Sequence, residues 1–212
     1  MIRFLRRLFD LNEGEGFKAS LMFGYGMLLI SAVIILKSVS NSLFIDSQGA
    51  GKLPYVFMVV ALLSALVASL YSRYSARMRL GRLIMLSFLV SIAFLVIFWL
   101  LLGGQAPRSW IFYAFYTWVV IFSVITGSQF WFLANAIYDA RQAKRIFGFI
   151  GAGSIVGGIG GGILTNLLAP LLGTRNLLFF AAGILCACLL LVAWIQNMRA
   201  RDPHRRRRRR GT

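Results

Sequence analysis

Acidic residues, histidine and cysteine are scarce in this sequence of 212 residues. The chain holds six Asp and Glu residues, one histidine and two cysteines, and only 14% of its residues are charged. In a soluble domain roughly a quarter of the residues are charged. The single histidine, His204, stands in an arginine-rich tail, and neither a nucleophile–base pair nor a pair of carboxylates within an apolar stretch is present in the sequence. We therefore expect neither an enzyme nor a bound cofactor.

The two cysteines and the glycines also lack the spacing of familiar sites. Cys186 and Cys188 lie in one apolar run and would point in different directions on a helix, so we expect packing rather than a disulfide or a metal site. Gly151-Ala-Gly153 resembles part of a dinucleotide fingerprint, but that motif needs a preceding strand and an acidic residue about 20 positions later. Without these, and without a Gly-Lys-Ser/Thr motif, we expect no Rossmann or P-loop nucleotide site.

Long apolar runs are the main feature of the sequence. Hydrophobic residues make up 59% of the chain. They fall in runs of about 20 residues, the helix length that crosses a hydrocarbon core of about 30 Å. Strand-like alternation is absent, and no segment reads as a soluble domain. The sequence predicts an all-α, polytopic membrane protein with a six-helix domain over residues 17–197. The expected spans are residues 17–44, 54–71, 83–102, 109–137, 146–172 and 176–196.

Basic residues flank these runs unevenly and give a net charge of +17. Nineteen of the 23 Lys and Arg residues form four clusters at alternate ends of the spans, and the other connections carry only Lys52, Arg108 and Arg175. Excess positive charge marks cytoplasmic loops, so both termini are expected in the cytoplasm. The clusters are Arg3, Arg6, Arg7 and Lys18; Arg73, Arg77, Arg79 and Arg82; Arg141, Lys144 and Arg145; and Arg199, Arg201 and Arg205 through Arg210.

The two ends of the chain are predicted to meet the membrane surface. Residues 1–16 favour an amphipathic helix lying in the headgroup region. A mitochondrial presequence is the rival interpretation, and the acidic residues of this segment argue against it. We expect no cleavable signal peptide, because the first apolar run begins too late. Residues 198–212 are predicted to be a disordered polybasic tail that binds anionic lipid headgroups rather than nucleic acid.

Two spans carry polar residues where lipid would make them costly. Lys37, with Asn41 one turn on, either faces a cavity or reaches water along its own stem. In the fourth span Ser128 and Asn135 share one face with Asp139. Such a stripe normally faces the bundle interior, where it lines a solute pathway or joins helices by hydrogen bonds.

The fifth span begins after a charged connection and is rich in glycine. Asp139 can cap a helix that begins at Ala140, with Arg141, Lys144 and Arg145 as ordinary cytoplasmic charges. Alternatively, these four residues form an inner gate of ion pairs that open and close. The glycines form small-xxx-small pairs, which let helix backbones approach closely. The glycines predicted to pack against another helix are Gly153, Gly157, Gly158, Gly161 and Gly162.

Several segments resemble the ATP:ADP antiporter family of nucleotide transporters, which belongs to the major facilitator superfamily. The resemblance rests on residues 37–44 and 53–56 and, above all, on Phe130-Trp-Phe-Leu-Ala-Asn135 with Ala140-Arg-Gln-Ala-Lys-Arg-Ile-Phe-Gly-Phe-Ile-Gly-Ala-Gly153. It covers all six spans, as the N-terminal half of that fold. The sequence departs from the family at Ala136, where an acidic residue often follows the asparagine.

The resemblance implies a secondary carrier that works by alternating access in a bacterial plasma membrane. Its partners would be the lipid bilayer, ATP, ADP or another anionic solute, and a second six-helix half, from a homodimer or a missing C-terminal portion. Lys37 and Asn41 would contact the substrate, and Ser128 and Asn135 would line its path. The alternative is a membrane anchor or sensor module of the same fold that does not transport.

Overall fold

The computed structural model describes residues 15–75, 80–104, 108–138 and 140–201. Within these residues there are six helices long and apolar enough to cross a membrane, and no strand. This confirms the predicted all-α, polytopic fold. The prediction of an interfacial helix falls almost entirely on residues outside the described ones, as does most of the polybasic tail.

The helices match the six predicted spans and extend several of them. Helix α2 runs on to Gln48 and thus includes the polar stretch after Leu36, and α7 continues four residues beyond position 197. The helices are α2 (Glu15–Gln48), α3 (Leu53–Ser75), α4 (Leu80–Leu101), α5 (Ser109–Ile137), α6 (Ala140–Leu172) and α7 (Leu177–Arg201), with a short 3-10 turn η1 (Ala50–Lys52) before α3.

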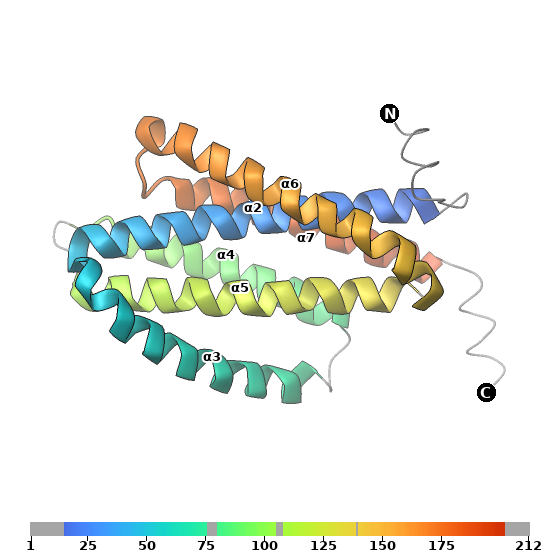
Figure 1. The fold of residues 1–212 in the computed structure, drawn as a ribbon, viewed down its shortest axis with the longest axis horizontal. Coiled ribbons are helices and arrows are strands. Elements are labelled where there is room, and N and C mark those ends of the chain that lie inside the picture. The colour runs from blue at the N-terminus through green and yellow to red at the C-terminus, as the bar shows by residue number, and fades with distance from the viewer. Residues whose placement is uncertain (1–14, 76–79, 105–107, 139, 202–212) are drawn as a thin grey trace.

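The six helices form two layers (Figure 1). In the front layer α6, α2, α5 and α3 lie side by side in that order, and α7 and α4 lie behind them. Helix α2 is the centre of the bundle and packs against α5, α6 and α7, whereas α3 leans away and packs chiefly on α5. The front faces of α2, α3, α5 and α6 are consequently covered by no other described element.

Aromatic packing holds the two layers together near the middle of α2. Tyr25 of α2 is fully buried, and its ring lies 6.3 Å from that of Phe88 in α4 and 5.6 Å from that of Phe130 in α5. Large rings at these separations contribute both buried area and favourable edge contacts. The contact with Phe130 also sets the relative height of α2 and α5.

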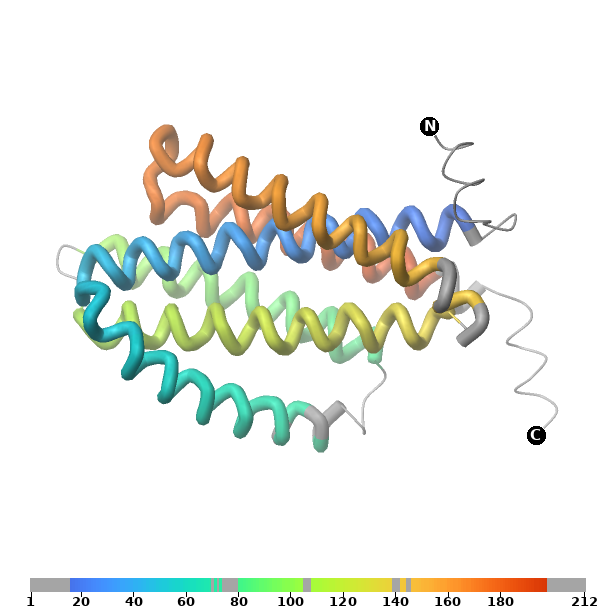
Figure 2. The backbone as a smooth tube through the Cα atoms, in the orientation of Figure 1, coloured from blue at the N-terminus to red at the C-terminus, as the bar shows by residue number. Residues whose placement is uncertain are grey.

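The connections divide between the two ends of the bundle, as the smooth trace of Figure 2 makes clear. The starts of α2, α4 and α6 and the ends of α3, α5 and α7 lie at one end. The three connections that carry Lys52, Arg108 and Arg175 lie at the other. We call these the inner and outer ends, following the orientation that the charge pattern predicts.

Candidate functional site

Three glycines of α6 form a tight seam with the inner half of α2. A Cβ atom placed on Gly153 would stand 2.6 Å from the carbonyl oxygen of Phe23, and one on Gly161 would stand 2.8 Å from the Cα of Ser31. One on Gly157 would collide with the backbone of Met27. Glycine alone permits this approach, because real side chains need more room.

Ser31 adds a polar link across the seam. Its hydroxyl oxygen lies 2.8 Å from the carbonyl oxygen of Gly157 on α6 and 2.8 Å from that of Met27 in its own helix. A single hydroxyl proton is thus offered to two carbonyls, one of which belongs to the neighbouring helix. The inner halves of α2 and α6 are therefore joined by backbone contact and by a hydrogen bond.

Beyond the seam the same two helices open into a polar groove towards the outer end. This groove has a volume of about 540 Å³, in the range of ligand pockets. Hydroxyl and amide groups on both helices and on the turn after α6 line it together with apolar residues such as Val39 and Leu177. Its residues include Ser38, Ser42, Gly162, Thr165, Asn166 and Thr174. We call it the α2–α6 groove.

Lys37 and Asn41 do not line this groove, but they directly precede Ser38 and Ser42, two of its lining residues on α2. They are neighbours one helical turn apart, and both side chains are exposed. The ammonium group of Lys37 has no ion-pair or hydrogen-bond partner among the described residues. Asp46, the one acidic side chain that the structure describes, is bonded instead to Ser42, at 3.4 Å. Lys37 thus offers an uncompensated positive charge next to a polar groove.

The structure does not bring Ser128 and Asn135 to the same level as Lys37. Both are exposed on α5, so the predicted stripe faces away from the interior of the six-helix bundle. The hydroxyl of Ser128 donates to the carbonyl of Val124 in its own helix, at 2.9 Å. Taking the Tyr25–Phe130 contact as the common level, Lys37 lies about 15 Å further out than Ser128 and about 25 Å further out than Asn135 at 1.5 Å per residue.

The side chains of the predicted gate residues lie outside the described part of the chain, and two of the five predicted packing glycines lie outside the seam. Helix α6 begins at Ala140 as expected, but Asp139 lies outside the described residues. The side chains of Arg141, Lys144 and Arg145, on the first turns of α6, also lie outside them. A Cβ on Gly162 would meet nothing within 4 Å and one on Gly158 only Ile30 at 3.7 Å, so neither belongs to the seam.

No family model, characterised protein or solved structure matches this chain.

Gln129 is a buried polar residue that sequence reasoning missed. Its amide nitrogen lies 2.8 Å from the hydroxyl of Tyr71 in α3 and 2.7 Å from that of Ser87 in α4, which links three helices. The sequence feature that could have indicated this buried residue is a glutamine among aromatic residues, directly after the exposed Ser128.

Arg175 at the outer end was also missed. Its guanidinium donates to the backbone carbonyl of Trp99, at 2.9 Å, and its Cζ lies 4.2 Å from the centre of the Trp99 ring. The indole nitrogen of Trp99 donates to Asn176, at 3.2 Å. These contacts clamp the turn between α6 and α7 to the outer end of α4. The charge pattern assigned Arg175 only to an outer connection.

Proposed function

We propose that this chain is a half-size secondary transporter of an anionic solute. It would work by alternating access with a second six-helix half, either another copy of the chain or a C-terminal portion. The resemblance to the ATP:ADP antiporter family makes ATP and ADP the first substrates to test. The bundle would reside in a bacterial plasma membrane with its inner end towards the cytoplasm.

The observation that carries this proposal is the polar content of the uncovered front layer. Lys37 and Asn41 on α2, Ser128 and Asn135 on α5 and Asn166 on α6 are all exposed, on helices that span by length and composition. Polar groups at this depth are costly against lipid and normally face protein or a water-filled cavity. A second half covering this layer would turn the exposed groups into the lining of a pathway.

The heights of these groups suggest that they act in succession. Lys37 and Asn41, beside the α2–α6 groove, would receive the anionic group of the solute in the outer half of the bundle. Ser128 and Asn135 would meet it about 15 to 25 Å further in, as helix heights indicate. Asp139 with Arg141, Lys144 and Arg145 would then form the inner gate.

Uptake into liposomes tests the proposal. Purified protein would be reconstituted and supplied with labelled ATP or ADP, with unlabelled nucleotide inside, and then with labelled phosphate or a carboxylate. We expect saturable exchange of at least one anion, reduced at least tenfold in Lys37→Gln. Arg108→Gln is the matched control, because it removes an exposed outer-end charge away from the groove.

Two results would count against transport. One is the absence of any anion exchange by a verified full-length protein. The other is exchange that Lys37→Gln leaves unchanged, which would remove the assigned role of Lys37. The anchor or sensor alternative is favoured if substitutions in the tail or on the glycine face abolish the cellular phenotype while Lys37→Ala leaves it intact.

A further inference from the structure

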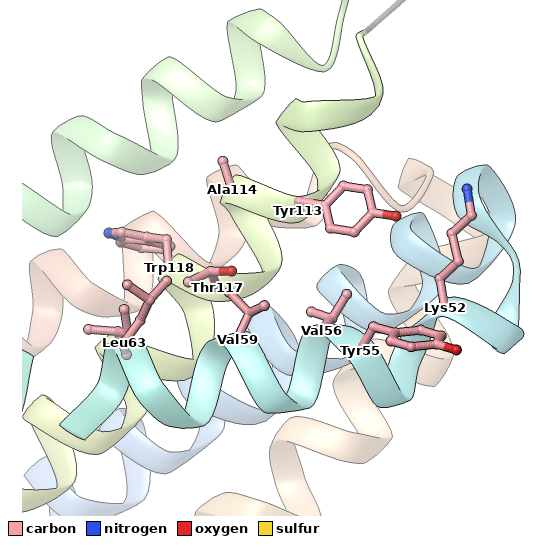
Figure 3. Close-up of a pocket in the computed structure, with 10 residues that line it drawn as sticks. Lys52, Tyr55, Val56, Val59, Leu63, Tyr113, Ala114, Thr117 and Trp118 are labelled. Atoms are coloured by element: carbon pink, nitrogen blue, oxygen red, sulfur yellow. The ribbon is translucent and has the colours of Figure 1, made fainter. Parts of the chain in front are cut away.

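A second groove, unrelated to the proposed pathway, lies between α3 and α5 near the outer end. It has a volume of about 620 Å³, and α5 forms its floor where α3 leans away (Figure 3). Val59 and Leu63 on α3 line it and are exposed, so the groove opens at the surface of the bundle. We call it the α3–α5 groove.

The α3–α5 groove has a polar end and an apolar end. Lys52, Tyr55 and Tyr113 place an ammonium and two phenol groups at its outer end, and Leu63 and Trp118 lie at the opposite end (Figure 3). Trp118 is itself braced against α4, with its ring 6.0 Å from Phe94 and 5.8 Å from Phe98. Between the two ends the lining is aliphatic apart from Thr117.

The direction and length of this polarity match one leaflet of a bilayer. From Lys52 to Leu63 the groove follows α3 for about 16 Å at 1.5 Å per residue. The hydrocarbon of one leaflet is roughly 15 Å deep, half of the bilayer core. Tyrosine and lysine at the outer end are also the residues that anchor helices at the headgroup level.

The rim of the α3–α5 groove carries one positive charge, that of Lys52. The ammonium of Lys52 contacts the side-chain oxygen of Gln48 at 3.3 Å, which occupies one of its three protons. The only acidic side chain that the structure describes, Asp46, is bonded to Ser42. Lys52 can therefore donate to a phosphate oxygen and to a further anionic group.

We propose that the α3–α5 groove is a binding site for an anionic phospholipid of the outer leaflet. An acyl chain lies along Val56, Val59 and Leu63 on one side and along Ala114 and Ile121 on the other. The headgroup phosphate accepts hydrogen bonds from Lys52 and from the neighbouring phenols. This site lies at the opposite end of the bundle from the polybasic tail, and it does not depend on transport.

Native mass spectrometry of the full chain tests the site. Delipidated protein would be titrated with phosphatidylglycerol and with phosphatidylcholine of the same acyl chains. We expect one tightly retained lipid and a preference for phosphatidylglycerol. Lys52→Gln should lower that preference about fivefold, the order that one lysine contributes beside an anionic surface. Lys52→Arg should retain it.

Filling the groove is the second arm. Ala114→Phe should abolish retention of both lipids, because the new ring occupies the path of the acyl chain. The controls are Ala61→Phe, which adds the same bulk on α3 outside the groove, and Arg82→Gln, which removes an exposed charge at the inner end. Both should bind like the unaltered protein.

Several outcomes would overturn the site. Equal retention of the two lipids by the unaltered protein, or an unchanged preference in Lys52→Gln, would show a merely annular lipid. Equal losses in Ala61→Phe and Ala114→Phe would do the same. A changed oligomeric state of Ala114→Phe with unchanged lipid retention would assign the groove to a second copy. The Lys52→Gln arm stands by itself if Ala114→Phe does not fold.

Discussion

The inner and outer halves of the α2–α6 pair are packed in opposite ways. In the inner half Gly153, Gly157 and Gly161 bring the helix backbones together, and Ser31 bonds across the contact. In the outer half the same helices are separated by a polar groove that includes Ser38 and Thr165. The two helices run in the same direction, so one helix pair is closed at its inner end and open at its outer end.

This difference shows how little sequence is needed to set a membrane helix contact. Apolar side chains gain no hydrophobic free energy from contacting each other rather than lipid. Close packing therefore depends on small residues that let the helix backbones approach each other. Gly161 and Gly162 are adjacent, yet only Gly161 lies in close contact with the backbone of α2, whereas Gly162 lines the α2–α6 groove. Beyond this point Thr165 and Asn166 replace glycine, and the helices separate enough to leave room for a solute.

The strongest way to break the contrast is to fill the seam. Gly157→Leu would drive a side chain into the backbone of Met27, which cannot move without displacing α2. We expect a loss of about 3 kcal/mol or more. In a Cys186→Ala background, the buried thiol of Cys188 would report unfolding by reaction with a thiol-specific fluorophore.

Gly162→Leu is the matched control on the same helix. Its Cβ meets open space, and leucine favours the helix by up to about 1 kcal/mol over glycine, so stability should be unchanged or slightly raised. If both variants are equally destabilised, helix propensity or insertion rather than the seam is responsible. The contrast between Gly157 and Gly162 would then have no packing basis.

Periodicity and composition were sufficient to predict the six helices, because apolar runs of spanning length have few other uses. The glycine pattern also predicted close packing, but five candidates were equivalent in spacing. Only the rotation of α6 about its axis, set by its neighbours, separates Gly157 from Gly162. The different heights of Lys37 and Ser128 follow from the predicted spans, which place Lys37 near the outer end of the first span and Ser128 in the inner half of the fourth; the structure adds the Tyr25–Phe130 contact that fixes the offset.

The outer end offers a second test of the contrast between the two halves, because the contacts of Arg175 with Trp99, rather than a glycine seam, hold the helices there. Arg175→Ala removes the hydrogen bond to Trp99 and the cation–π contact. We expect a loss of about 2 kcal/mol, since both interactions involve a charged group. Arg108→Ala, an exposed arginine at the same end, should cost less than about 0.5 kcal/mol in the same thiol assay. Equal losses would point to net charge instead.

Helix α3 has few contacts with the other helices and offers a third test of what holds the bundle together. At its inner end Tyr71 is bonded to Gln129, and Tyr71→Phe would leave one amide proton of the buried Gln129 without this acceptor. We expect a cost of about 1 kcal/mol. Hydrogen exchange should rise in the inner half of α3 and stay unchanged in α2. Tyr113→Phe, which removes a phenol oxygen at the outer end, should alter neither, and similar exchange in both variants would contradict the role of Tyr71.

The smallest expected effect is that of Ser31→Ala, which tests how much the hydrogen bond contributes to the seam. Ser31→Ala removes the hydroxyl between Gly157 and Met27 without changing the backbone contact. Hydrogen bonds between membrane helices are worth about 0.6 kcal/mol on average, so we expect a loss of that order in the thiol assay. The carbonyl of Gly157 can still accept from its own helix, which keeps the cost low. Ser128→Ala, whose hydroxyl bonds only within α5, should be neutral. A loss in Ser31→Ala as large as that in Gly157→Leu would mean that the hydrogen bond, and not the missing side chains, closes the inner half of the pair.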